Sequence, residues 1–247
     1  MAVVGAPGLD EIQWGRERAR TGPWRGNQAV AYLSPVADAP APSAAFVRRC
    51  LSDLSARGYR QVVTSALSPL ESGGFLAAGF EITERLHLLT HDLERLPSTP
   101  TVPTQRGRER DHTAVLELDH RAFPPFWQLD GHGLYEALHA TPHHRFRVST
   151  DATGERVIGY AVYGRAGRRG YLQRLAVDPD HRHLGLGTAL VVDGLRWLRR
   201  WRAERVVVNT QLDNAAALTL YERLGFHRQP VGLSVLSTGL PPVSGRL

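Results

Sequence analysis

Apolar residues recur along this chain at two spacings, one typical of helices and one typical of strands. Beyond about residue 111 the two spacings interleave, which predicts a mixed α/β sheet with helices on both faces. The predicted elements are helices at 113–123 and 134–138, strands at 145–149, 157–163 and 171–177, a helix at 187–200, a strand at 205–210, a helix at 215–224, and a strand segment from 226 towards 236.

A smaller set of elements precedes this part. Its predicted elements are strands at 28–35 and 61–64 and helices at 43–57 and 71–80. Prolines and threonines without apolar periodicity fill 96–104, which is typical of a semi-extended linker. We therefore expect a smaller α/β unit over 1–97, a linker over 98–110 and a second unit over 111–247.

The two ends of the chain are less informative. Residues 1–23 and 240–247 carry weak patterns, and we expect them to be mobile. The N-terminus lacks a basic stretch followed by an apolar one, so a secretory signal is not expected.

Composition narrows the class of protein. At 42% hydrophobic residues the chain can bury a core, but no apolar run approaches the ~20 residues that cross a bilayer. The single cysteine, Cys50, excludes an internal disulfide and fits a reducing compartment. All 30 basic residues other than histidine are arginines, which indicates a compositional bias toward arginine. The charge of +6 is explained by this bias and does not require a nucleic-acid partner. We expect a cytoplasmic protein that does not enter membranes.

A short loop with two glycines joins the strand at 171–177 to the following helix. Gly185 and Gly187 let the backbone approach an anion without a Cβ in the way. Unpaired N–H groups stand at the positive end of the helix dipole, and Arg182 adds a fixed charge nearby. The loop therefore predicts a site for a phosphate or pyrophosphate group.

A second motif, Asn214–Phe226, follows the next predicted strand and carries Tyr221. Short glycine patterns arise often by chance. Here, however, the Arg182–Gly187 loop lies between a strand and a helix, and the second motif follows in order. Over about 111–236 the two motifs resemble the GCN5-related N-acetyltransferases, the GNAT family, which implies a GNAT-type mixed sheet flanked by helices.

The resemblance implies acetyl-CoA as the acyl donor and a role for each motif residue. The end of the strand would pair with the pantetheine arm, the loop would hold the pyrophosphate, and Asn214 would hydrogen-bond the cofactor. Tyr221 stands where the family places a general acid, and a phenol with a pKa of ~10 has a proton to give at neutral pH. The implied cofactor-binding residues are Leu175, Ala176, Val177, Arg182, His183, Leu184, Gly185, Leu186, Gly187, Thr188 and Asn214.

Each of these residues also has a structural interpretation. The glycines can serve a tight turn, Asn214 can be only a helix cap, and Tyr221 can be an ordinary half-buried aromatic residue. The functional interpretation is preferred because the residues occur together and in the expected order.

The sequence identifies no general base. Related enzymes often place a glutamate where this chain has Tyr171 or Asn209, and neither is a useful base at neutral pH. A water chain can take this role, or a side chain near the two early helices can. The candidates are Glu117, Asp119, His120, Asp130 and His132.

Aromatic residues gather in 123–132, between those two helices. They can line an acceptor pocket in which Asp130 attracts a positively charged amine, or they can pack the helical pair onto the sheet. The histidines at 143–144 and at 181 and 183 lack acidic or cysteine partners at metal-ligand spacing, so no metal is expected.

The first unit parallels the second in its order of strand, helix, strand and helix, and its last helix also ends in Gly-Phe. We interpret it as a degenerate half-copy of the GNAT fold. Residues 37–42 replace the glycine loop with prolines that lack N–H donors, and Phe75 or Leu76 stands near the tyrosine position. This unit is not expected to bind acetyl-CoA.

The sequence thus predicts an N-acetyltransferase that transfers an acetyl group directly to a primary amine in a ternary complex. The acceptor is a protein N-terminus, a lysine or a small molecule, and the oligomeric state stays open. One alternative is a non-catalytic acyl-CoA-binding module, favoured by the missing glutamates. The other, less favoured, is an arginine-rich nucleic-acid binder, which would bind with a strong dependence on salt.

Overall fold

The computed structural model describes residues 9–36, 39–98 and 102–241. The chain forms two compact units. Unit 1 comprises Met1–His87 and Pro230–Leu247, and unit 2 comprises Leu88–Gln229. These units are bounded differently from the predicted segments, because the end of the chain returns to unit 1 and the predicted linker lies inside unit 2.

Unit 1 is a sheet with two helices. Its strands follow the order β1-β2-β3-β4-β12-β5, and β5 continues past His87 into unit 2. The element bounds are β1 Asp10–Trp14, β2 Glu17–Trp24, β3 Asn27–Pro35, α1 Ala44–Ala56, β4 Gln61–Thr64, α2 Pro69–Leu76, β5 Glu81–His91 and β12 Leu233–Gly239.

The helices of unit 1 begin at serines that act as N-caps. The Ser43 hydroxyl accepts the N–H of Phe46, and Ser68 forms a reciprocal capping box with Glu71. A cluster that includes Phe46 and Phe75 forms the core beneath α1 and α2. The four elements predicted for this part of the chain are therefore present.

The first hairpin, β1–β2, corrects the expectation that residues up to 23 have no fixed structure. Four of the five residues of β1 are exposed and the fifth is half-buried, and only Ile12 and Trp14 alternate with polar residues. Residues 1–8 and 242–247 of the two predicted mobile ends lie outside the described residues, as do Ala37, Asp38 and 99–101.

Unit 2 is the larger of the two units. Its strand order is β5-β10-β9-β8-β7-β6, and β11 also pairs with β5. The bounds are β6 Gln105–Arg106, η1 Glu109–Asp111, α3 His112–Ala122, η2 Pro125–Trp127, α4 Gly131–His139, β7 His143–Thr150, β8 Val157–Ala166, β9 Arg169–Val177, η3 Pro179–His181, α5 Leu186–Arg200, β10 Arg205–Gln211, α6 Ala215–Arg223 and β11 His227–Arg228.

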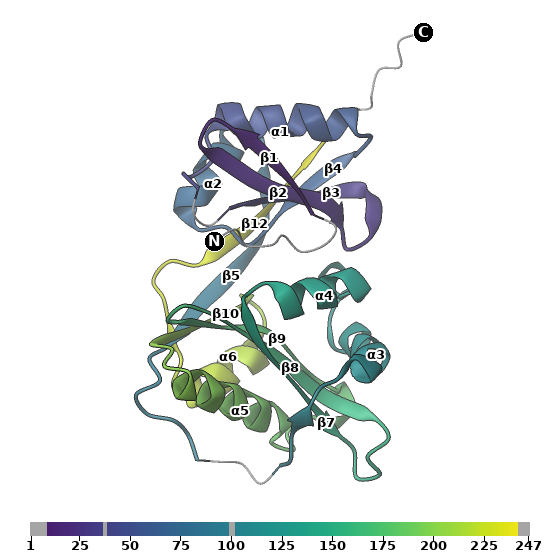
Figure 1. Cartoon of the computed structure of the whole chain (residues 1–247), viewed down its shortest axis with the longest axis vertical. Helices are drawn as coiled ribbons and strands as arrows, with labels where there is room; N and C mark the ends of the chain where they lie inside the picture. Colours follow the sequence, from purple (N-terminus) through teal and green to yellow (C-terminus); the bar gives the residue numbers. More distant parts are fainter. Residues whose placement is uncertain (1–8, 37–38, 99–101, 242–247) are drawn as a thin grey trace. The chain divides into compact units, whose positions relative to one another are not determined.

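Helices cover both faces of the unit 2 sheet (Figure 1). On one face, the residues of α5 and α6 pack with Tyr163, Leu172 and Val206. On the other, α3 and α4 pack with Tyr160 and Val162. Alternation along β8 therefore sends side chains into two separate cores, which confirms the predicted α/β sheet with helices on both faces.

The last predicted strand, 226–236, is two strands in different units. β11 ends at Arg228, and Pro230 interrupts the run because it has no N–H to donate. A Cβ on Gly232 would lie 2.3 Å from the Leu86 carbonyl oxygen, so glycine permits the chain to enter unit 1 there. Register shifts again between Val235 and Leu236.

Candidate functional site

The glycine loop presents a row of free backbone donors. The loop follows β9 and leads into α5, whose N-cap is Gly185. Within the described residues, no backbone N–H from Arg182 to Thr188 donates to a protein acceptor; the first such bond at the helix start is from Ala189 to Gly185, at 2.9 Å. Residues 182–185 are exposed. These unpaired N–H groups, at the positive end of the α5 dipole, can bind an anion.

The two glycines of the loop have different roles. Gly185 adopts φ +81°, a left-handed conformation that favours glycine. Gly187 has an ordinary φ, but a Cβ there would lie 3.1 Å from Leu220 of α6 and 3.7 Å from Val177. Gly185 therefore shapes the loop, whereas Gly187 allows the start of α5 to approach α6.

Asp178 fixes the beginning of the loop. Its side chain is fully buried and accepts hydrogen bonds from the Asp180 N–H at 3.0 Å, from Arg121 at 2.9 Å and from Arg156 at 2.8 Å. Sequence analysis overlooked this residue because Asp-Pro after a strand is an ordinary turn signal. The two arginines that identify it as an anchor are far from it in sequence.

Ionisation of Asp178 is expected to stabilise the protein. Burial opposes the charge, but the Asp180 N–H and Arg121 outweigh it and hold the pKa of Asp178 below its usual value. A lowered pKa contributes stability above the unfolded-state value of about 3.9 and loses it as pH falls through the folded-state pKa. The free energy of unfolding of the wild type should therefore exceed that of Asp178→Asn at pH 7, and the difference should shrink below about pH 4. A difference that is constant with pH would contradict this role.

β9 and β10 separate along their length. They are parallel and pair only from Arg205 with Arg169 to Val207 with Tyr171, although β9 continues to Val177. A bulge in β9 occurs where Val162 faces Arg174 and Tyr163 faces Leu172. The backbone of 174–177 pairs with β8 on one side only, so its other edge is open to an extended ligand.

Tyr221 lies on α6, with 5% of its surface exposed and its ring 5.5 Å from that of Phe226. Burial raises the pKa of Tyr221 well above the usual phenol value, and the positive charge of Arg174 partly opposes this. Tyr221 therefore stays protonated across the physiological range and has a proton to donate.

Asn214 is the N-cap of α6: its Oδ1 accepts the Ala217 N–H at 3.1 Å. Asn214 thus has the structural role of a helix cap. It is compatible with a second role, because capping uses the amide oxygen and leaves the two N–H donors of the side chain.

The base candidates differ in their surroundings. Asp119 is fully buried and engaged by Arg174 and Tyr160. Asp130 caps α4 by accepting the Gly133 N–H at 2.8 Å. His120 keeps its Nε2 2.7 Å from the Leu129 carbonyl oxygen. Glu117 and His132 are exposed.

Within 9–36, 39–98 and 102–241, no group of three or more metal-ligating side chains comes together. No helix in this described part is long and apolar enough to cross a bilayer. A cavity of about 340 Å³ borders the outer side of α5, lined in part by Arg145, Asp193 and Trp197, but neither the glycine loop nor Tyr221 lines it.

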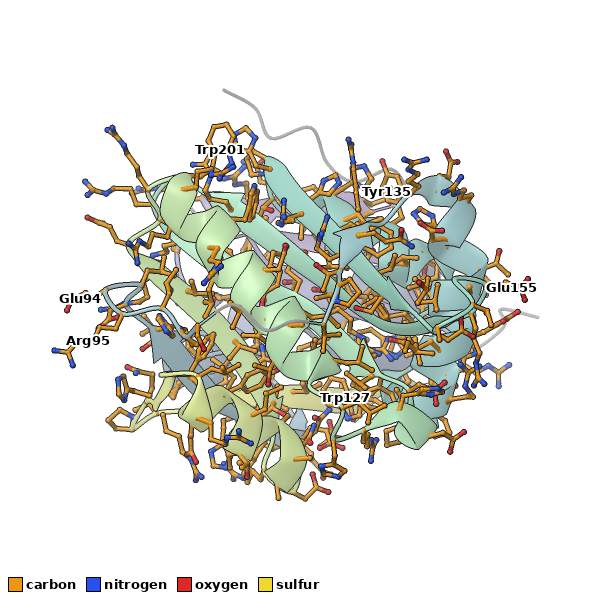
Figure 2. All side chains as sticks on the ribbon, turned by 90° about the horizontal axis from the view of Figure 1, so that it is seen from below. Glu94, Arg95, Trp127, Tyr135, Glu155 and Trp201 are labelled. Carbon is orange, nitrogen blue, oxygen red and sulfur yellow. The ribbon has the colours of Figure 1, made fainter. Side chains whose placement is uncertain are left out.

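Two tryptophans, Trp197 and Trp201, lie among the arginines at the end of α5 and have different environments. Trp197 packs against the core of unit 2, as a packed helix face requires. Trp201 is 55% exposed at the end of α5, where Figure 2 labels it.

The family model for the acetyltransferase (GNAT) family matches residues 112–226. This span contains α3 through α6 and both motifs. Residues 112–226 therefore form a GNAT acetyltransferase domain. The GNAT domain therefore includes the glycine loop, the open edge of β9 and Tyr221 in one unit.

Curated relatives carry two kinds of name. Mycothiol acetyltransferase of Saccharomonospora viridis is 36% identical over 131 residues, 47% of this chain and 42% of that protein. N-alpha-acetyltransferase 30 of Xenopus laevis is 37% identical over 81 residues, 33% of this chain and 30% of that protein. The chain thus spans less than half the length of these relatives.

A solved structure resembles both units. The tandem GNAT protein from the clavulanic acid biosynthesis pathway has a TM-score of 0.71 at 15% identity, covering 97% of this chain and 86% of that one. A GNAT protein from Kribbella flavida has a TM-score of 0.63 at 14% identity, covering 95% and 90%. At such identities the likeness concerns the fold.

Unit 1 has a different environment at the helix that corresponds in order to α5. A carboxylate of the protein occupies the N-terminus of α1, where Glu17 accepts from the N–H and the hydroxyl of Ser43. A Cβ on Gly74 of α2 would lie 1.9 Å from the Pro42 carbonyl oxygen, so the segment before α1 packs directly on α2.

Proposed function

We propose that this chain is an acetyl-CoA-dependent N-acetyltransferase that acts on a primary amine. The observation that carries the proposal is the run of unpaired N–H groups from Arg182 to Thr188, directly after the open edge of β9. GNAT acetyltransferases use acetyl-CoA as acyl donor, and a pyrophosphate with an extended amide-containing arm fits a row of donors followed by an unpaired strand edge.

In this proposal, N–H groups of residues 183–188 bind the pyrophosphate, with Arg182 beside them. The backbone of Leu175–Val177 aligns the pantetheine arm, and a backbone N–H of this strand stabilises the charge that develops on the thioester oxygen. Asn214 uses its free amide donors on the cofactor. The thioester supplies the activated acetyl group.

Tyr221 acts as the general acid. The amine attacks the thioester carbon, forming the amide bond, and the carbon–sulfur bond breaks with the electron pair leaving on sulfur. Tyr221 donates its proton to this thiolate and regains one from solvent after CoA leaves. Water or a surface base accepts the proton that the amine loses, since neither Tyr171 nor Asn209 is a base.

Unit 1 is proposed not to bind acetyl-CoA and to be a degenerate copy of the fold. Support comes from Glu17 at the α1 N-terminus and from Pro40 and Pro42, which have no N–H. The units would then differ in function, with unit 1 structural or shaping the acceptor site.

The fold does not identify the acceptor, so the proposal is tested by measuring CoA release from acetyl-CoA with different amines. We expect CoA release with either a small amine or peptides with free N-termini, since relatives are named for mycothiol and for N-alpha acetylation. Burial raises the pKa of Cys50 to about 12, so the chain's own thiol adds little background to a thiol reagent. If the chain binds acetyl-CoA but releases no CoA with either the small amines or the peptides, the second candidate is favoured, a non-catalytic acyl-CoA-binding module.

A further inference from the structure

Asp119 is the centre of a buried polar cluster that joins α3, β8 and β9. Its carboxylate accepts from Arg174 Nε and Nη2, both at 2.7 Å, from the Tyr160 hydroxyl at 2.5 Å and from the Leu129 N–H at 2.7 Å. A carboxylate offers about four acceptor sites. All are used, so Asp119 serves as a fixed counterion.

Arg174 connects this counterion to the segment Phe123–Asp130. The same guanidinium donates to the Trp127 carbonyl oxygen at 2.6 Å and lies 3.6 Å from the centre of the Phe123 ring. A planar fork can make these contacts together with the Asp119 pair, which a lysine ammonium cannot. One side chain of β9 thus holds both ends of the aromatic stretch; Trp127 is labelled in Figure 2.

The segment also has hydrogen bonds of its own. The N–H groups of Trp127 and Gln128 donate to the carbonyl oxygens of Pro124 and Pro125 in the single turn η2. Gln128 Nε2 donates to the carbonyl oxygens of His120 and Phe123, at 3.0 and 3.1 Å. These bonds lie within the segment or join it to α3, whereas Arg174 joins it to β9.

The position of Arg174 connects this anchor with the reaction. Arg174 directly follows Gln173, the residue that the register shift of β9 leaves without a partner on β8, and directly precedes Leu175–Val177, the proposed pantetheine strand. It is also close enough to Tyr221 to favour the phenolate against burial. A buried ion pair adds little net stability compared with packed apolar side chains, so stability alone does not account for it.

We propose that Arg174, with Asp119 as its counterion, is a positioning residue that holds Phe123–Asp130 against β9 as one wall of the acceptor-amine site. This inference rests on the proposed acetyl transfer. It assigns the aromatic segment to acceptor binding, one of the two interpretations that the sequence left open.

The test compares Arg174→Met and Arg174→Lys with a matched control, Arg145→Met. Arg145 forms the same kind of bidentate pair, with Asp193 at 2.7 Å, but on the α5 side of the sheet. In the full chain, Arg174→Met should raise the KM for the amine at least tenfold and change the Kd for acetyl-CoA less than twofold. Arg174→Lys should recover part of the loss, and Arg145→Met should behave as wild type.

Amide hydrogen exchange at Leu129 gives a readout that does not need turnover. Because this N–H donates to Asp119, its exchange rate should be at least tenfold higher in Arg174→Met than in the wild type. The rate should be unchanged in Arg145→Met. Equal exchange in the two variants, an unchanged KM for the amine, or parallel losses of amine and acetyl-CoA binding would overturn the proposal. If the wild type transfers no acetyl group, the proposed function fails, whereas the exchange result still decides whether Arg174 anchors the segment. If Arg174→Met does not fold, the exchange rate at Leu129 is measured in Arg174→Lys instead. A rate equal to that of the wild type would overturn the anchoring role of Arg174, and a faster rate would support it.

Discussion

Tyr221→Phe is expected to lower kcat by about 10²–10⁴-fold, the usual contribution of a positioned proton donor. The substitution removes one oxygen from a buried ring that packs on Phe226, so the fold and the Kd for acetyl-CoA should change little. Tyr163→Phe is the matched control, because Tyr163 is equally buried and its hydroxyl binds the Val191 carbonyl oxygen at 3.2 Å. Steady-state turnover of both variants measures the effect, and equal loss in both would contradict the assignment.

The pH dependence of kcat follows from the same environment. A general acid must be protonated, and burial raises the pKa of Tyr221 above the usual value of ~10. Wild-type kcat should therefore show no fall caused by loss of this proton as pH rises to ~10. A descending limb near pH 8 that is absent in Tyr221→Phe would be inconsistent with this environment.

Gly185→Ala is expected to weaken acetyl-CoA binding about tenfold, since a Cβ at positive φ costs roughly 1–2 kcal/mol and 1.4 kcal/mol corresponds to a factor of ten. With φ at +81°, the loop must change conformation to accept a Cβ, which moves the N–H groups of Arg182–Thr188. Loss of affinity is therefore the primary effect, and kcat at saturation should change less.

Gly154→Ala provides the matched control for this substitution. Gly154 has φ +79° and, like Gly185, little around its Cβ position, but it lies in the turn between β7 and β8. It should lose similar stability and keep the wild-type Kd for acetyl-CoA. Calorimetry and thermal unfolding separate the two effects, and equal Kd values for the two variants would exclude the loop from acetyl-CoA binding.

The sequence predicted those parts of the fold whose residues are neighbours in the chain. β9, the glycine loop and α5 are consecutive in the chain, and their apolar spacing and glycines indicate a strand, a turn and a helix. Asn214 caps α6, as its residue type indicates. β1 was missed because its alternation is limited to Ile12 and Trp14, which is too short a pattern to predict a strand. β12 belongs to unit 1 because it pairs with strands more than 140 residues earlier, and local sequence patterns do not contain this information.

The candidate site follows the same division. The motifs predict Tyr221 and Arg182–Thr188 as site residues, whereas Asp178 and Arg174 gain their significance from partners distant in sequence. Asp119 was a candidate base by residue type, but its buried pairing with Arg174 makes it a counterion. Spacing alone does not distinguish a carboxylate that is free to accept a proton from one that is fully bonded.

The central claim is that unit 2 alone carries an acetyl-CoA site, at the glycine loop. Calorimetric titration of the full chain with acetyl-CoA tests it most directly. The account predicts one acetyl-CoA bound per chain, with affinity about tenfold lower in Gly185→Ala and unchanged in Glu17→Gln, which alters the α1 N-terminus of unit 1. No binding, or two acetyl-CoA molecules per chain, would contradict it.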